Sequence, residues 1–205
     1  QGNFVSNIAH YGFKFVGLAV LRFTFETGNS GSILKNAILK EKEQGYEIVT
    51  WNDEYLEEAI VIVQKAFENS SDALFDTRFK SVEGTRNILE NIVQGNYGEF
   101  LPEAVSVLLF NGKLCGFCFI NITGGKIANV PIFAIAPEHQ GKGLSKHLLK
   151  KSVQTLLDWT KTGKKSFSEI NTTTETDNYQ ALKMYRHIGF KEDYAYSQSY
   201  LPISD

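Results

Sequence analysis

A glycine-rich turn between an apolar run and an amphipathic helix constrains this chain most. The run ends in Phe133-Ala134-Ile135-Ala136-Pro137, and the turn is Gln140-Gly141-Lys142-Gly143-Leu144-Ser145. Beyond the turn, leucines recur with the 3.6-residue period of a helix. Such a turn places a helix N-terminus beside the end of a strand, where backbone N–H groups and the helix dipole favour an anion. The pattern predicts an α/β domain whose turn is either a phosphate cradle or simply a tight connection.

Two common nucleotide-binding patterns do not fit this turn. A Walker loop needs Lys and then Ser or Thr directly after its last glycine, where this chain has Leu144-Ser145. The dinucleotide fingerprint needs a third glycine three residues after Gly143, where Lys146 stands. The strands before the turn are also expected to be antiparallel, unlike those of a βαβ unit. The sequence therefore disfavours both kinds of nucleotide site.

The rest of the chain alternates strand and helix patterns. Asn111-Gly112 between two apolar runs is the strongest local signal, because it favours a type I′ hairpin. Gly163 and Gly189 are expected to end two helices. We predict an α/β (α+β) fold with a mixed central sheet. The expected elements are a β-prone segment 4–26, a loop 27–32, a helix 33–44, a strand 46–51, a helix from residue 53 through 67, a helix 84–93, strands 104–110, 114–120 and 127–135, a helix from residue 144, a strand 166–174, a helix ending at 188, and a last strand or strand pair 191–201.

The composition narrows the class of protein. Hydrophobic residues make up 42% of the 205 residues and charged residues 21%, so the chain can bury a core. The net charge of −2 does not favour nucleic acid or an anionic membrane, and no apolar stretch approaches the ~20 residues of a membrane helix. Cys115 and Cys118, the only cysteines, lie in an apolar run and are interpreted as buried and structural. We expect a cytoplasmic protein with no metal, no nucleic-acid partner and no membrane partner.

Two motifs in the second half of the chain resemble those of the GNAT N-acetyltransferases. Gln140-x-x-Gly143-x-Ser145 is similar to the acyl-coenzyme-A motif Gln/Arg-x-x-Gly-x-Gly/Ala, from which Ser145 departs at the last position. The segment 178–190 is similar to the second signature, Asn-x-x-Ala-x-x-x-Tyr…Gly-Phe. The resemblance covers the chain from about Tyr46 to the C-terminus. It implies a GNAT acyltransferase fold, in which two parallel strands splay apart within a mixed sheet flanked by helices.

The resemblance also implies acetyl-coenzyme A as the cosubstrate and a role for each motif. Main-chain groups of the strand before the turn would pair with the pantetheine arm, and backbone N–H groups of the turn would hold the pyrophosphate. Asn178 would bind the arm of the coenzyme, and Tyr185 would protonate the leaving thiolate as the catalytic residue. From the residues alone, Asn178 could equally be a helix cap and Tyr185 a core aromatic residue. The implied coenzyme-binding residues are Phe133, Ala134, Ile135, Gln140, Gly141, Lys142, Gly143, Leu144, Ser145 and Asn178.

The chemistry of such a transfer leaves the general base open. An amine with a pKa near ~10 must lose a proton before it attacks the thioester. Many members of the family place a Glu on the strand before the phosphate turn, but residues 127–136 contain no acid. The polar run 171–174, the loop 69–85 and the two early helices are expected to line the acceptor cleft. The remaining candidates for the base, besides a chain of water molecules, are Glu169, Glu175, Asp177, His139 and His147.

Two functions remain open at this point. The first is an acetyl-coenzyme-A-dependent N-acetyltransferase that transfers the acetyl group directly to a primary amine of a small molecule, peptide or protein. The second is a non-catalytic acyl-coenzyme-A sensor or interaction domain, which the missing acid would explain. The intact Tyr185 favours the enzyme.

The first 45 residues precede this core and repeat part of it. His10-Tyr11-Gly12-Phe13-Lys14 resembles His187-Ile188-Gly189-Phe190-Lys191, and both copies lead into strand-like sequence. We predict an N-terminal extension over residues 1–45, with a strand pair and a helix, and an acetyltransferase domain over residues 46–205. The repeat favours the tail of a degenerate upstream copy, and a chance match of five residues is the alternative. A first residue other than Met and a single Met, Met184, are expected of a chain cut from a longer one.

Overall fold

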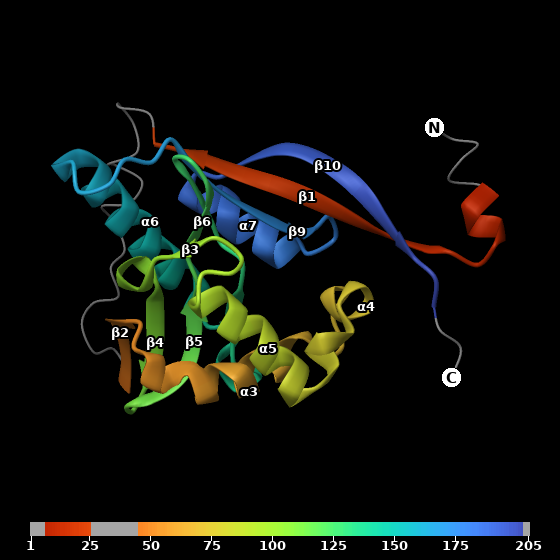
Figure 1. Cartoon of the computed structure of the whole chain (residues 1–205), viewed down its shortest axis with the longest axis horizontal. Coiled ribbons are helices and arrows are strands. Elements are labelled where there is room, and N and C mark those ends of the chain that lie inside the picture. The colour runs from red at the N-terminus through yellow and green to blue at the C-terminus, as the bar shows by residue number, and fades with distance from the viewer. Residues whose placement is uncertain (1–6, 26–44, 203–205) are drawn as a thin grey trace.

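Two β-sheets form the centre of the fold (Figure 1). The computed structural model describes residues 7–25 and 45–202. The strand order is β10-β1-β9-β7-β6-β3 in the larger sheet and β2-β4-β5-β8 in the smaller one. The elements are β1 (Lys14–Thr24), β2 (Tyr46–Thr50), η2 (Asp53–Tyr55), α3 (Leu56–Phe67), α4 (Asp72–Phe75), η3 (Thr77–Lys80), α5 (Val82–Val93), β3 (Glu99–Phe100), η4 (Pro102–Ala104), β4 (Ser106–Phe110), β5 (Lys113–Cys118), β6 (Asn121–Gly124), β7 (Ile127–Asn129), β8 (Phe133–Ile135), η5 (Pro137–His139), α6 (Ser145–Thr162), β9 (Glu169–Glu175), α7 (Tyr179–Ile188) and β10 (Lys191–Tyr200).

The two sheets separate just before the glycine-rich turn. β7 pairs in parallel with β9, and the N–H of Val130 still donates to the carbonyl of Asn171 at 3.0 Å. Pro131 follows and has no N–H to continue the ladder, and β8 then pairs with β5 in the other sheet. The single strand predicted over residues 127–135 is therefore wrong, because Pro131 divides it into two strands in two sheets. The predicted splaying of parallel strands is confirmed, since β8 diverges from β9.

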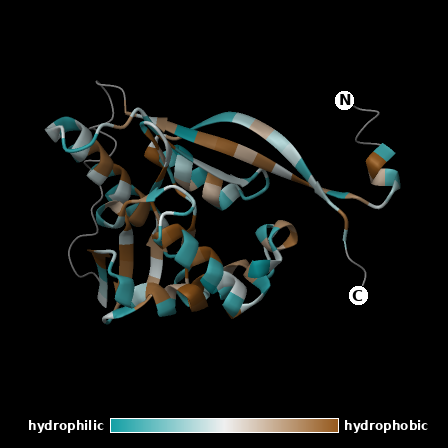
Figure 2. Ribbon diagram, in the orientation of Figure 1, coloured by the Kyte–Doolittle hydropathy of each residue, from teal (hydrophilic) through white to brown (hydrophobic). Residues whose placement is uncertain are grey.

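Helices cover the smaller sheet and supply most of the core with it. α3 packs on β5 and β8 with α5 beside it, and α6 packs on β4 and β5 with α7 beside it. Figure 2 shows the hydrophobic residues on the strands and the hydrophilic residues on the outer faces of the helices. Among the described residues, no helix is long and apolar enough to cross a membrane. The largest side chains without solvent exposure include Phe117, Phe119, Ile60, Leu89, Leu108, Leu148, Leu149 and Leu156.

Turn and cap residues end the elements where the sequence predicts. Asn111 (φ 49°) and Gly112 (φ 80°) are both left-handed, as a type I′ hairpin requires. Oδ1 of Asn178 accepts a hydrogen bond from the N–H of Ala181 at 3.1 Å, which caps the start of α7. Gly189, with φ 104°, ends that helix. Asn178 and Gly189 therefore fix where the helix of the second motif begins and ends.

The N-terminal segment differs from its prediction. Instead of a strand pair within residues 4–26, the described part has a helical turn at residues 7–10 and one strand, β1. Gly12 (φ 87°) ends the helical turn, so the β-prone residues form strand only after it. β1 lies between β9 and β10 and buries Ala19, Leu21 and Phe23, and Phe25 directly after the strand is buried as well. The predicted loop 27–32 and helix 33–44 lie outside the described residues.

Candidate coenzyme groove and acceptor cleft

The glycine-rich turn connects η5 to α6 with its backbone turned outward. Gly141 and Gly143 each have a φ of 73°, which side chains with a Cβ rarely adopt. A Cβ at Gly141 would meet no atom within 4 Å, so this glycine is required for its conformation rather than for space. Leu144, the N-cap of α6, gives the first N–H groups of the helix no side-chain acceptor. The arrangement can therefore bind an anion through main-chain N–H groups and the helix dipole.

Three side chains hold the turn against the sheet. Nε2 of Gln140 donates to the carbonyl of Ile135 at 2.8 Å, and Nζ of Lys142 donates to the hydroxyl of Tyr46 at 3.1 Å. The same hydroxyl pairs with Nδ1 of His139 at 2.8 Å. Lys142 is therefore tied to β2 instead of reaching freely over the rim. Sequence reasoning missed Tyr46, since it lies 96 positions before Lys142 and belongs to no motif.

A groove of about 220 Å³, which we refer to as the coenzyme groove, runs along the turn between β8 and α7. It brings together most of the predicted coenzyme-binding residues, although they come from two motifs. Ala134 lines the neighbouring cavity instead, and Lys142 lines neither. The predicted residues that line the groove are Phe133, Ile135, Gln140, Gly141, Gly143, Leu144, Ser145 and Asn178.

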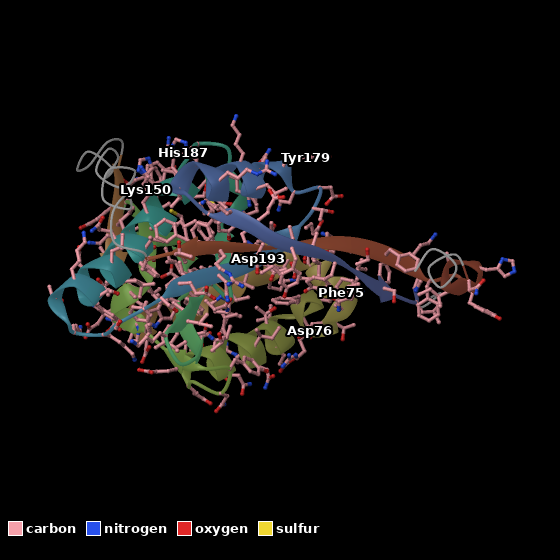
Figure 3. All side chains as sticks on the ribbon, turned by 90° about the horizontal axis from the view of Figure 1, so that it is seen from above. Phe75, Asp76, Lys150, Tyr179, His187 and Asp193 are labelled. Atoms are coloured by element: carbon pink, nitrogen blue, oxygen red, sulfur yellow. The ribbon has the colours of Figure 1, made fainter. Side chains whose placement is uncertain are left out.

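A second cavity of about 570 Å³ opens between the splayed strands β8 and β9. Its walls include Thr172, Thr173 and Thr174 of the predicted polar run 171–174. They also include part of the segment 69–85, for which the prediction of a loop is wrong, because the segment contains the short helices α4 and η3. Figure 3 shows Phe75 and Asp76 of this wall beside the ribbon formed by β1 and β10. We refer to this cavity as the acceptor cleft. It shares with the coenzyme groove the residues Phe133, Ile135, Gln140, Asn178, Ala181 and Met184.

Tyr185 lies on the wall of the acceptor cleft and is also part of the core. Its side chain is 4% exposed and packs on the ring of Phe190, with ring centroids 5.2 Å apart. Its hydroxyl lies 3.5 Å from the hydroxyl of Thr172. Burial raises the pKa of Tyr185, and the hydrogen bond from Thr172 opposes part of that rise. The phenol therefore stays protonated through the neutral range and can donate a hydrogen bond into the cleft.

Carboxylates also line the acceptor cleft. Of the five candidates for the base, Glu175 alone lines the cleft, and it accepts a hydrogen bond from the hydroxyl of Ser71. Asp72, which the sequence did not indicate, lines it as well. Loss of solvent raises the pKa of Asp72, and the negative charge of Glu175 adds to the effect. The pair gives the cleft a negative potential suited to an ammonium group.

The other candidates for the base lie elsewhere. Glu169 pairs with Arg22 at 3.1 Å on the far part of the sheet, and His139 lines the coenzyme groove beside Tyr46. Neither Asp177 nor His147 lines either cavity. Within the described residues, no group of three His, Cys, Asp or Glu side chains could hold a metal ion.

The comparison with protein families decides the assignment. Residues 102–192 match the family model described as an acetyltransferase (GNAT) domain. The chain contains a GNAT acetyltransferase domain. The match includes the glycine-rich turn, the splayed strands and Tyr185, so both cavities are built largely within the GNAT domain.

Solved structures show the same fold over nearly the whole chain. A GCN5-related N-acetyltransferase from Sphaerobacter thermophilus superposes with a TM-score of 0.64 at 15% identity, over 100% of this chain and 58% of that one. A tandem GNAT protein from the clavulanic acid biosynthesis pathway gives 0.58 at 15% identity, over 100% and 60%. This chain therefore spans about three fifths of the length of these GNAT structures. No curated protein matches the sequence.

Proposed function

We propose that this protein is an acetyl-coenzyme-A-dependent N-acetyltransferase that transfers the acetyl group directly to a primary amine. The wall that the coenzyme groove and the acceptor cleft share supports this proposal most strongly. An acyl thioester in the groove would present its carbonyl at that wall, directly in front of the cleft. Holding both reactants in one site replaces a collision in solution by a reaction between positioned groups. No covalent enzyme intermediate is then needed.

The edge of β8 would orient the coenzyme. β8 is the last strand of the smaller sheet, so one row of its main-chain groups faces the splay instead of another strand. Those groups suit the amides of the pantetheine arm, and an N–H among them would stabilise the oxyanion that forms during attack. The turn from Gln140 to Ser145 would hold the pyrophosphate, and the coenzyme supplies the activated acetyl group. Asn178 caps α7 and also faces the groove, so its two interpretations are compatible.

The acceptor cleft supplies the groups for the proton transfers. An ammonium group is drawn toward Glu175 and Asp72. Glu175 takes one of its protons directly or through water, and the neutral amine attacks the thioester carbonyl. As the C–N bond forms, the nitrogen becomes acidic and releases its second proton to water. The C–S bond then breaks, Tyr185 gives its hydroxyl proton to the sulfur, and a proton from water restores the phenol. The products are an amide and the coenzyme thiol.

The lining of the cleft indicates the kind of amine that fits. The rings of Phe67 and Phe79 stack with centroids 5.1 Å apart, and both lie on the same wall as Asp72. A cleft with carboxylates and aromatic rings favours a cationic amine that carries an apolar group. We therefore expect such amines to be better acceptors than short, fully polar ones.

The carboxylates of the cleft also bear on the alternative of a non-catalytic sensor. That alternative was motivated by the absence of an acid from residues 127–136. Glu175 and Asp72 provide acids in the cleft from β9 and α4 instead, so the enzyme is the function that the geometry favours.

A binding measurement and an amine panel together test the proposal. Calorimetry should detect coenzyme A, and mass spectrometry should detect an acetylated product with at least one amine of the panel. Coenzyme binding without any acetylated product across aliphatic, aromatic and peptide amines would support the sensor. Absence of coenzyme binding would refute both functions.

A further inference from the structure

Residues 7–24 repeat the architecture of residues 179–200. Each unit is a helical segment that ends in a left-handed glycine, followed by Phe and a long strand. In each unit the glycine N–H donates to the carbonyl three residues earlier, and the Phe N–H donates to the carbonyl five residues earlier. The two distances are 3.0 and 3.3 Å around Gly12, and both are 3.0 Å around Gly189. This pair of bonds is the Schellman motif, so the five-residue sequence match corresponds to a shared backbone structure.

The strands of the two units are neighbours and run antiparallel. The first residue of β1, Lys14, lies opposite Tyr200, and the first residue of β10, Lys191, lies opposite Arg22. Two equivalent strands paired in this way are related by a two-fold axis, which is the relation between like subunits in an isologous contact. The pairing therefore resembles a contact between two like domains, each contributing its last strand.

β1 is bound firmly within the larger sheet. Arg22 reaches Glu169 of β9 at 3.1 Å and Asp193 of β10 at 2.6 Å, and Figure 3 shows Asp193 on β10 beside β1. The carbonyl of Gly17 accepts the N–H of Thr176 at 2.8 Å, and a Cβ at Gly17 would lie 2.3 Å from Oγ1 of Thr176. The slot between β9 and β10 is therefore shaped for this strand.

The two-fold relation leaves one position in the sheet unfilled. β1 pairs with β10 on one side and with β9 on the other, from Leu18 to Thr24. β10 pairs with β1 only, and all of its residues except Tyr200 are exposed. Figure 1 shows the far end of the β1–β10 ribbon and the helical turn at residues 7–10 standing away from the core. A long open strand edge favours pairing with a further strand, and an isolated two-stranded ribbon is only marginally stable in water.

We propose that the open edge of β10, together with residues 7–17, is the docking surface for a second acetyltransferase-type domain that precedes residue 7 in the same polypeptide. β1 is the last strand of that domain, and its equivalent of β9 pairs with the second half of β10. Figure 2 shows that β10 is more hydrophilic than β1, so main-chain pairing dominates the contact at this edge. Ile8 occupies the position that corresponds to Tyr185. The preceding domain therefore lacks the hydroxyl that Tyr185 supplies in this domain, and its role is structural.

The size of the native polypeptide gives the first test. Intact-mass and peptide-mapping mass spectrometry of the protein purified from its source should show roughly 100 to 150 further residues before residue 7, the size of one domain. Those residues should contain a strand, a turn and a helix in the acetyltransferase order. A native chain that begins near residue 1, or a preceding sequence without that order, would overturn the proposal.

Hydrogen exchange gives the second test. Peptides covering residues 7–17 and 194–201 should exchange more slowly in the native polypeptide than in the 205-residue chain, while α6 serves as an internal control that does not change. Equal exchange in the two proteins would refute docking at this edge. Light scattering of the 205-residue chain tests whether a second copy of this chain occupies the edge of β10 instead. If that chain forms dimers in which residues 194–201 are protected, a second copy covers the edge and the proposal is wrong.

Discussion

The coenzyme groove and the acceptor cleft share a wall but are constructed differently. The groove depends mainly on the main chain of one continuous turn, where two glycines are left-handed and a helix begins. The cleft depends on side chains that come from segments as far apart as Leu18 and Gln198. A site made of backbone is sensitive to conformation, whereas a site made of side chains is sensitive to the loss of single functional groups. Substitutions should therefore affect the two cavities in different ways.

The largest effect is expected at Tyr185, on the wall of the acceptor cleft. Tyr185→Phe removes the hydroxyl that stabilises the leaving sulfur, and we expect kcat to fall by about 10²-fold or more. Affinity for coenzyme A, measured by calorimetry, should stay the same. Tyr179→Phe is the matched control, because Tyr179 begins the same helix and its side chain is 75% exposed. Undiminished turnover of Tyr185→Phe would show that the hydroxyl has no role in the reaction.

A smaller loss is expected at Glu175. Glu175→Gln removes the proposed base but keeps the size of the side chain, and kcat/KM for the amine should fall by about 10- to 100-fold. The deficit should shrink as the pH rises, because a larger fraction of the amine is then already neutral. Asp177→Asn removes a nearby carboxylate that lines neither cavity and should change nothing. A loss that is the same at every pH would indicate that Glu175 positions the amine rather than accepting its proton.

Alanine substitutions at two glycines, Gly143 and Gly163, separate the effect of backbone conformation on coenzyme binding from its effect on stability. Gly143 and Gly163 have φ values of 73° and 75°, so alanine at either should cost about 1 to 2 kcal/mol of strain. Only Gly143→Ala should weaken coenzyme binding, by about 10-fold, because Gly163 ends α6 away from both cavities. Calorimetry and thermal unfolding of both variants measure the two effects. Equal coenzyme affinity in both variants would contradict a binding role for the backbone of the turn.

The smallest effect concerns the stability contribution of Asp72. Its raised pKa means that the folded state is penalised once the carboxyl ionises, from the unfolded pKa of about 3.9 upward through the higher folded pKa. Asp72→Asn should therefore stabilise the fold at pH 7 by less than about 1 kcal/mol, and this gain should disappear as the pH falls through that window. Urea unfolding at several pH values measures it. A variant that is less stable than the parent at pH 7 would show that the carboxylate is held favourably.

The groove could be predicted from the sequence because its residues are consecutive or lie in one capped helix. The spacing from Gln140 to Ser145 and the cap at Asn178 both indicate geometry that the structure contains. The cleft could not be predicted in the same way, since Ser71 and Glu175 meet across 104 positions. The break at Pro131 was visible in the sequence as a residue without an N–H, but which sheet each half joins depends on tertiary packing. The neighbours of β1 are likewise set by pairing across the chain and not by any local pattern.

The two cysteines have a practical consequence for measuring the reaction. Cys115 is 2% exposed and Cys118 is not exposed, and burial raises the pKa of each thiol to about 12. Their thiolate forms, which react with disulfide dyes, are therefore very scarce at the pH of an assay. A dye of this kind added during turnover would be cleaved by released coenzyme and hardly at all by the protein. The same dye would detect unfolding of the chain, as a slow release of two further equivalents.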